Sequence, residues 1–206
     1  MRIIQSLRAA AVAALAIAAL GQATPAQAAS VAIAPSSYTT TAGSDGGQPV
    51  ANLATQDQSG SNNNWNKYVE FSPSGSASYA GYRSYTVPAS VTLADVTAIQ
   101  VQANFLGPAP ADQTWTWQIY SWGDSAWATL GSNTGTSWSA WKQLSFSASG
   151  TLASYINSST REIRIRLTAS NTSDSADLDY EAVTLTTGGA SATATPATPA
   201  TATRTP

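Results

Sequence analysis

The chain has 206 residues, contains neither cysteine nor histidine, and carries a formal net charge of −2 at pH 7. The lack of cysteine excludes a disulfide-stapled extracellular scaffold, and the lack of histidine removes the commonest general base and a common metal ligand. Basic residues are too few to form a patch that neutralises a phosphate backbone, so nucleic acid is not expected as a partner.

The first 28 residues have the features of a secretory signal peptide. Arg2 and Arg8 form a basic start, residues 9–20 form an apolar run, and Ala26-Gln27-Ala28 supplies the small residues of a cleavage site. The apolar run is too short to span a bilayer, and the rest of the sequence contains no apolar segment that is long enough. We therefore expect a secreted, extracellular protein without a membrane span in the mature chain. Loss of Arg2 and Arg8 leaves seven basic residues against eleven acidic ones, a net charge of −4.

Residues 29–187 are long enough for one domain with its own hydrophobic core. Apolar and polar residues alternate with a period of two, or β-forming residues cluster, in several short segments: 66–72, 84–91, 96–105, 114–122, 161–169 and 177–185. The segment 149–159 has the spacing of one or two helical turns. Many short strands separated by Gly, Ser, Asn and Pro predict an all-β fold, an antiparallel two-sheet β-sandwich of the jelly-roll kind.

The loop that precedes these strands is rich in asparagine. Residues 61–68 read SNNNWNKY, which does not suit a regular strand but supplies adaptable hydrogen-bonding groups around Trp65. Trp65 is interpreted either as a platform for a ligand or as the anchor of a long loop, and the sequence does not decide between them.

The segment 114–122, TWTWQIYSW, is the richest in aromatic residues. Period-two alternation places Trp115, Trp117 and Ile119 on one face, which we expect to be buried because Ile119 belongs there. The opposite face carries Gln118, Tyr120 and Trp122. A tight connection at Gly123-Asp124 should bring Trp127 close to Trp122 at the end of the sheet.

Two other strands are expected to present outer faces of the same kind, one with Gln102 and Asn104 and one with Arg164 and Arg166. Amides and arginines hydrogen-bond the hydroxyl edge of a pyranose, while an aromatic ring covers its C–H face. The pattern predicts a sugar-binding surface. The rings of Trp122 and Tyr120 would stack on the sugar, and Gln102, Gln118 and Arg166 would hydrogen-bond the hydroxyls of the sugar. A simpler interpretation pairs Arg164 and Arg166 with Asp179 and Glu181 across adjacent strands of a solvated face.

Carboxylates gather near the last strand. Asp174 and Asp177 lie close together in sequence, and Asp45 is a candidate remote ligand; this oxygen-rich set would suit Ca²⁺, although it lacks the spacing of an EF-hand. No cofactor is required, and a structural calcium is the one ion that this set suggests. The alternation of the last strand places Asp177, Asp179 and Glu181 on one face, and its break predicts a bulge or twist near Ala182.

Residues 188–206 contain only Gly, Ala, Ser, Thr, Pro and one arginine, so they cannot bury enough apolar surface to fold. The composition predicts an extended linker or tail. A linker suggests a further domain beyond it, such as a catalytic domain.

The stretches ADVTAIQVQANFLGP, TWTWQIYSW…AWATLGS, GTLASYIN…REIRIRLTAS and SADLDYEAVTL resemble the galactose-binding-like, jelly-roll carbohydrate-binding modules of secreted bacterial glycoside hydrolases, especially those of actinobacteria. The resemblance covers about half of the chain and is architectural, so it transfers no binding residue. It implies carbohydrate binding, a Thr/Pro linker to a catalytic domain and, in many such modules, a structural Ca²⁺.

Three function classes follow from these observations. The leading one is a non-catalytic secreted module that binds polysaccharide or a cell-surface glycan. The second is an extracellular adhesion module that binds protein. The third is a glycan-active enzyme using a carboxylate pair such as Asp179 and Glu181, but residues two apart on one strand do not flank a substrate.

Overall fold

The computed structural model describes residues 28–188, so the predicted signal peptide and the predicted linker lie outside it except for one residue each. Within this range all helices are short 3-10 turns, and none of them is long and apolar enough to cross a membrane.

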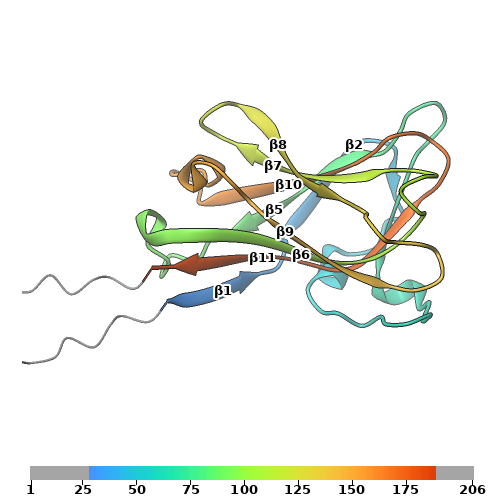
Figure 1. The fold of residues 1–206 in the computed structure, drawn as a ribbon, viewed down its shortest axis with the longest axis horizontal. Coiled ribbons are helices and arrows are strands. Elements are labelled where there is room, and N and C mark those ends of the chain that lie inside the picture. The colour runs from blue at the N-terminus through green and yellow to red at the C-terminus, as the bar shows by residue number, and fades with distance from the viewer. Residues whose placement is uncertain (1–27, 189–206) are drawn as a thin grey trace, which may run out of the picture. The chain divides into compact units, whose positions relative to one another are not determined.

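The described residues form two antiparallel sheets packed face to face (Figure 1). Five strands form one sheet in the order β2-β5-β10-β7-β8, with bounds Ser37–Ala42, Ala80–Thr86, Glu162–Ala169, Trp115–Ser121 and Ala126–Ser132. The other sheet has the order β3-β4-β11-β6-β9, with bounds Ser44–Asp45, Val69–Ser72, Ala176–Thr187, Val96–Leu106 and Lys142–Ser147. Its sixth strand, β1 at Ala29–Ile33, also pairs with β11. The predicted jelly-roll sandwich is confirmed.

Period-two burial builds the core between the sheets. In β7 every second residue is buried, and Trp115, Trp117 and Ile119 are fully inaccessible to solvent, as the alternation predicts. Phe105 and Phe146 of the opposite sheet pack against Trp117, with ring centroids 5.4 and 5.1 Å away. These rings fill the interior with large apolar area, which stabilises a domain that has no disulfide.

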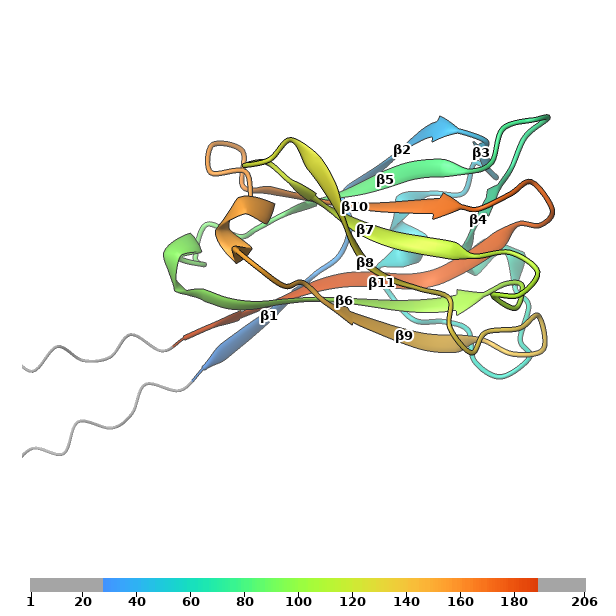
Figure 2. The same cartoon turned by 45° about the horizontal axis from the view of Figure 1, so that its top comes forward.

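The sandwich has two distinct ends (Figure 2). The strand β1 begins and β11 ends at the same end, where Ala29 pairs with Thr187. That end also holds the β7–β8 turn and the 3-10 turn η4 at Leu152–Tyr155. We call it the terminal end. The opposite end, which we call the loop end, holds the segment 54–68 together with the loops 133–141 and 170–175.

The 3-10 turns occur in the connections between strands. In addition to η4, they are η1 at Val50–Leu53, η2 at Trp65–Lys67 and η3 at Leu93–Asp95. The segment 149–159 was expected to contain one or two helical turns, and it contains the single turn η4. Residues 66–72 were expected to be a strand, but the first part is η2 and the strand β4 begins only at Val69.

The assignment of strands to sheets corrects two expectations. The strands β10 and β11 belong to different sheets, so Arg164 and Arg166 do not form a ladder with Asp179 and Glu181. The pairing of β11 with β6 is irregular at two places, a bulge between Leu178 and Tyr180 and a shift between Thr186 and Thr187, and neither is near Ala182. This earlier bulge reverses the alternation at Asp179, so that both Leu178 and Glu181 are buried and the predicted shared face of Asp177, Asp179 and Glu181 does not form.

Candidate functional site

The outer face of the five-stranded sheet carries a layer of interleaved arginines and aromatic rings, which we call the arginine–aromatic face. Period-two alternation places these side chains outward, and strand register brings them together: Arg166 lies opposite both Gln118 and Tyr82, and Tyr120 lies opposite Trp127. The face consists of Tyr82, Gln118, Tyr120, Trp122, Trp127, Arg164 and Arg166. Five of these seven residues were predicted as ligand contacts: Gln118, Tyr120, Trp122, Arg164 and Arg166.

The two arginines of this face stack on its rings. The guanidinium carbon of Arg164 lies 4.7 Å from the ring centroid of Trp122 and 5.0 Å from that of Tyr82. The guanidinium of Arg166 lies 4.6 Å from the centroid of Trp127. Each such cation–π contact contributes on the order of 0.5–1 kcal/mol at a partly exposed site. The stacking holds the rings in fixed orientations before any ligand arrives.

Hydrogen bonds orient the same arginines. Arg164 donates from Nε and Nη2 to the carboxylate of Glu162 at 2.8 and 3.0 Å, and Arg166 donates from Nε to Gln118 Oε1 at 2.7 Å. Burial raises the pKa of Glu162, but the hydrogen bonds from Arg164 and Ser84 outweigh it, so the pKa lies below its ordinary value. Glu162 therefore stays ionised and holds Arg164 in place at neutral pH.

Trp122 lies where this face meets a hollow at the terminal end. Its indole Nε1 donates to the Glu162 carbonyl at 3.1 Å, and its backbone N–H donates to the Ser154 carbonyl at 2.7 Å. Tyr120 contacts the indole edge-on at 5.0 Å. The hollow has a volume of about 430 Å³ and is lined by Trp122, Gly123, Ala153, Ser154, Ile156, Asn157, Ser158 and Ser159. A half-buried indole beside hydroxyls and an amide offers both the apolar surface and the polar groups that a sugar requires.

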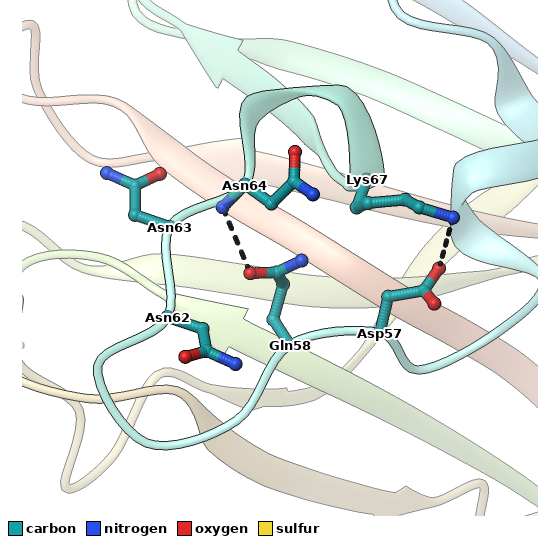
Figure 3. Close-up of a pocket in the computed structure, with 6 residues that line it drawn as sticks. All are labelled: Asp57, Gln58, Asn62, Asn63, Asn64 and Lys67. Atoms are coloured by element: carbon teal, nitrogen blue, oxygen red, sulfur yellow. Dashed lines mark hydrogen bonds and ion pairs between the residues drawn. The ribbon is translucent and has the colours of Figure 1, made fainter.

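A second concavity lies at the loop end and is lined by polar residues (Figure 3). Its volume is about 320 Å³, and its walls are Asp57, Gln58, Asn62, Asn63, Asn64 and Lys67. We call it the amide pocket. Lys67 Nζ lies 3.6 Å from Asp57 Oδ2, so the two opposite charges at its wall face each other.

The two large apolar side chains that are exposed within residues 28–188 are also at the loop end. Trp65 is 45% exposed and Trp138 is 42% exposed. The ring of Trp65 packs edge-on against Tyr68 at 5.6 Å, and the indole Nε1 of Trp138 donates to Asp174 Oδ2 at 2.9 Å. Trp65 is therefore both exposed and part of the loop packing. Sequence reasoning missed Trp138, although its serine-rich loop SWSAW was a signal for an exposed position.

Three predicted ligand contacts do not belong to the arginine–aromatic face: Trp65, at the loop end, and the two amides Gln102 and Asn104. Gln102 and Asn104 are on β6, in the six-stranded sheet, so they lie on the other side of the sandwich. Asn104 is fully buried because segment 54–68 covers it, and its amide donates to the Gln58 carbonyl at 3.0 Å and to Asp179 at 2.8 Å. Asn104 is therefore a structural residue.

The carboxylates predicted to bind calcium are not gathered into one site. Within residues 28–188, no group of three or more acidic, histidine or cysteine side chains is placed to hold a metal ion. Asp45 accepts a hydrogen bond from Thr40 Oγ1 at 2.8 Å, and Asp174 accepts the indole N–H of Trp138. Calcium binding stays a prediction without support from this geometry.

Asp177 has an unusual environment. The residue is 4% exposed, and its Oδ1 atom has no hydrogen-bond partner among the described residues. Burial, followed by the charges of Glu70 and Asp174, raises the pKa of Asp177 to about 8. Asp177 is therefore largely protonated in the folded protein near neutral pH.

The carboxylate pair considered for catalysis lies in the interior. Asp179 and Glu181 are both fully buried, and the bulge directs them to different partners. Asp179 accepts the backbone N–H groups of Asp57 and Gln58, and Glu181 accepts hydrogen bonds from Arg83, Tyr85 and Trp117. Two carboxylates that are enclosed in this way do not flank a substrate.

Residues 53–180 match the model of the N-terminal glycosyl-hydrolase-114-associated domain. The chain belongs to this family. No curated protein matches the sequence of this glycosyl-hydrolase-114-associated domain.

Several solved carbohydrate-binding modules are similar to this glycosyl-hydrolase-114-associated domain in structure. TmCBM61, solved with beta-1,4-galactotriose, is 14% identical, with 72% of this chain and 88% of that chain covered and a TM-score of 0.42. The xylan-binding domain CBM22-1 from Paenibacillus barcinonensis Xyn10C is 11% identical, with coverages of 66% and 80% and a TM-score of 0.39. The CBM35 from Cellvibrio japonicus Abf62 is 8% identical, with coverages of 78% and 94% and a TM-score of 0.39. The family match confirms the expected resemblance to modules associated with glycoside hydrolases, and the two antiparallel sheets confirm the expected fold.

Proposed function

We propose that this glycosyl-hydrolase-114-associated domain is a non-catalytic, secreted module that binds polysaccharide or a cell-surface glycan and serves a glycoside hydrolase domain. The observation that carries the proposal is the position of Trp122, a half-buried indole between the arginine–aromatic face and a hydroxyl-lined hollow. Membership of a family named for its association with glycosyl hydrolases supports the same function.

The chemistry of the face suits a sugar chain. A pyranose has apolar C–H faces and a rim of hydroxyls, so it binds best where a ring lies beside fixed hydrogen-bonding groups. Tyr120 and Trp122 supply the rings. Gln118, Arg164 and Arg166 supply the amide and guanidinium groups, which their mutual contacts already hold in place. Such preorganisation lowers the entropy that binding must otherwise spend on ordering side chains.

A non-catalytic role agrees with the chemistry of the described residues. The chain contains no histidine or cysteine, and the carboxylate pair Asp179 and Glu181 is enclosed in the interior. A glycosidase needs two carboxyl groups on opposite sides of an accessible bond. We therefore assign binding, and not cleavage, to this chain.

The test is retention of the full chain on a panel of insoluble polysaccharides, with Trp122→Ala as the variant. We expect Trp122→Ala to bind about tenfold more weakly or worse, a loss of about 1.4 kcal/mol or more. Trp138→Ala is the matched control, because it removes a more exposed indole at the opposite end. Circular dichroism at 25 °C should show that both variants are folded. If the unmodified chain is retained by no polysaccharide, or if Trp122→Ala is retained as well as the unmodified chain, the assignment is wrong.

A further inference from the structure

The amide pocket and Trp122 lie at opposite ends of the same sandwich. Trp122 follows β7 at the terminal end, whereas the pocket is formed by segment 57–67 at the loop end (Figures 1 and 2). The two concavities share no lining residue. One ligand unit therefore does not occupy both, and each requires its own explanation.

A buried carboxylate, that of Asp179 on β11, anchors the first residues of the amide pocket. Asp179 Oδ2 accepts the backbone N–H groups of Asp57 at 2.9 Å and Gln58 at 2.8 Å, and it also accepts the amide of Asn104. Hydrogen bonds from backbone N–H groups to a buried carboxylate are among the stronger kinds in proteins. They fix the start of the segment against β11.

The far side of the pocket is anchored by two aromatic residues. Trp141 donates from Nε1 to the Asn62 carbonyl at 2.7 Å, and Tyr68 donates from its hydroxyl to Asn63 Oδ1 at 2.6 Å. Gln58 Oε1 accepts the backbone N–H of Asn64 at 3.1 Å and so ties the two sides together. A loop held at this many points is a preformed concavity, as ligand sites usually are.

The lining favours a small uncharged ligand that is rich in hydroxyl or acetamido groups. Three asparagines and one glutamine offer both donors and acceptors, and the charges of Asp57 and Lys67 face each other at 3.6 Å. A volume of about 320 Å³ lies at the lower end of the range for small-molecule sites, which suits a single sugar unit better than the side of a long chain.

We propose that the amide pocket is a second sugar site that binds one uncharged sugar unit, at a chain end or a branch, so that one molecule can bridge two glycan chains. This proposal rests on the proposed function, because it assumes that the Trp122 surface binds the side of a chain. Two sites at opposite ends of a rigid sandwich also increase retention on a dense polysaccharide without increasing the affinity of either site.

The experiment is a titration of the ¹⁵N-labelled full chain, followed by NMR, with cellotriose, xylotriose, β-1,4-galactotriose and triacetylchitotriose as probes. The Trp122 indole N–H reports on the first site, and the side-chain amides of Asn62 and Asn63 report on the second. We expect one probe to move both sets of signals, each with its own saturation curve. The variant Asn62→Ala/Lys67→Gln should weaken the second curve by about tenfold or more and leave the first unchanged. Asn66→Ala, on the same turn but outside the pocket lining, is the matched control.

The outcomes separate the two proposals. Shifts at Trp122 without shifts at Asn62 and Asn63 overturn the second site and leave the proposed function standing. Shifts in the pocket without shifts at Trp122 overturn bridging and also the Trp122 assignment. No shift with any probe, combined with no retention on polysaccharide, overturns both proposals. As a direct test of bridging, the unmodified chain should cross-link a soluble polysaccharide that it binds, and both Trp122→Ala and Asn62→Ala/Lys67→Gln should lose this ability.

Discussion

Arg83 and Glu181 form a fully buried ion pair that joins the two sheets. Arg83 is on β5 of the five-stranded sheet and Glu181 is on β11 of the six-stranded sheet, and Arg83 Nε donates to Glu181 Oε2 at 2.6 Å. Tyr85 and Trp117 also donate to the Glu181 carboxylate. The acid is thus satisfied by three neighbours, which is how a buried charge is tolerated.

Removal of one partner of this pair should be strongly destabilising. Glu181→Gln leaves the Arg83 guanidinium buried without a counter-charge, so we expect the free energy of unfolding to fall by about 3–5 kcal/mol. Urea denaturation followed by tryptophan fluorescence measures this loss. The double variant Arg83→Met/Glu181→Leu should recover part of it, because it removes both charges. An equal or larger loss in the double variant would contradict the unpaired Arg83 charge as the cause of the destabilisation.

Asp177 should make stability depend on pH. Its pKa is about 8 in the folded protein against an ordinary value of 3.8, so the folded state binds the proton more tightly than the unfolded state. This contribution is complete below about pH 4 and is lost as the pH rises toward 8. Asp177→Asn mimics the protonated form, so it should be more stable than the unmodified chain at pH 8 by on the order of 1–3 kcal/mol.

The measurement for Asp177 is the melting temperature of both chains across pH 4–9. The gap between the two should widen as the pH rises from 4 to 8 and then stay constant. Glu70→Gln is the companion variant, because Glu70 is one of the two charges that raise the pKa of Asp177. In a chain that carries Glu70→Gln, the difference in melting temperature that Asp177→Asn causes at pH 8 should be smaller. A difference in melting temperature between the unmodified chain and Asp177→Asn that does not change with pH would contradict the raised pKa of Asp177.

Asp179 should control the order of the amide pocket. Asp179→Ala removes the acceptor for the backbone N–H groups of Asp57 and Gln58, so these amides should lose protection from hydrogen exchange. The expected loss of stability is about 1–3 kcal/mol, because buried donors are left without partners. Lys67→Gln is the control: it breaks only the exposed contact with Asp57, which contributes about 0–1 kcal/mol, and it should leave the exchange unchanged.

Arg164 should act through its planar shape as well as its charge. Arg164→Lys keeps the charge but loses the guanidinium that stacks on Trp122 and Tyr82, so we expect weaker retention on polysaccharide and a changed Trp122 environment in fluorescence. The loss should be several-fold, in line with about 0.5–1 kcal/mol for an exposed cation–π contact. Arg164→Met removes both the charge and the planar guanidinium, so its difference from Arg164→Lys measures the contribution of the charge. Equal retention for Arg164→Lys and the unmodified chain would indicate that charge alone matters.

The alternation of buried and outward-facing residues within a regular strand was predicted correctly from the sequence. Trp115, Trp117 and Ile119 are buried and Gln118 lies on the outer side, because successive residues of a strand point to opposite faces whatever the strand pairs with. The two-sheet architecture followed from the same pattern and from the many short strands. This part of the fold depends only on local geometry and on the hydrophobic effect.

The partners of each strand could not be read in this way. Gln102 and Gln118 occupy the same kind of outward position, yet they lie on different sheets, because alternation is identical in every half-buried strand and carries no label for its neighbours. The alternation also did not predict the position of the bulge at Asp179. One extra residue moved Glu181 into the core, where Arg83 neutralises it, and left Asp179 to anchor segment 54–68.

In a regular strand such as β7, the order of residues along the chain is enough to tell which side faces the interior, because that depends on residues two apart. Which side chains meet, such as Arg164 with Trp122 and Asp179 with Gln58, follows only from the folded arrangement. These contacts join segments far apart in the chain, and they depend on sheet order, on register and on the bulge at Asp179.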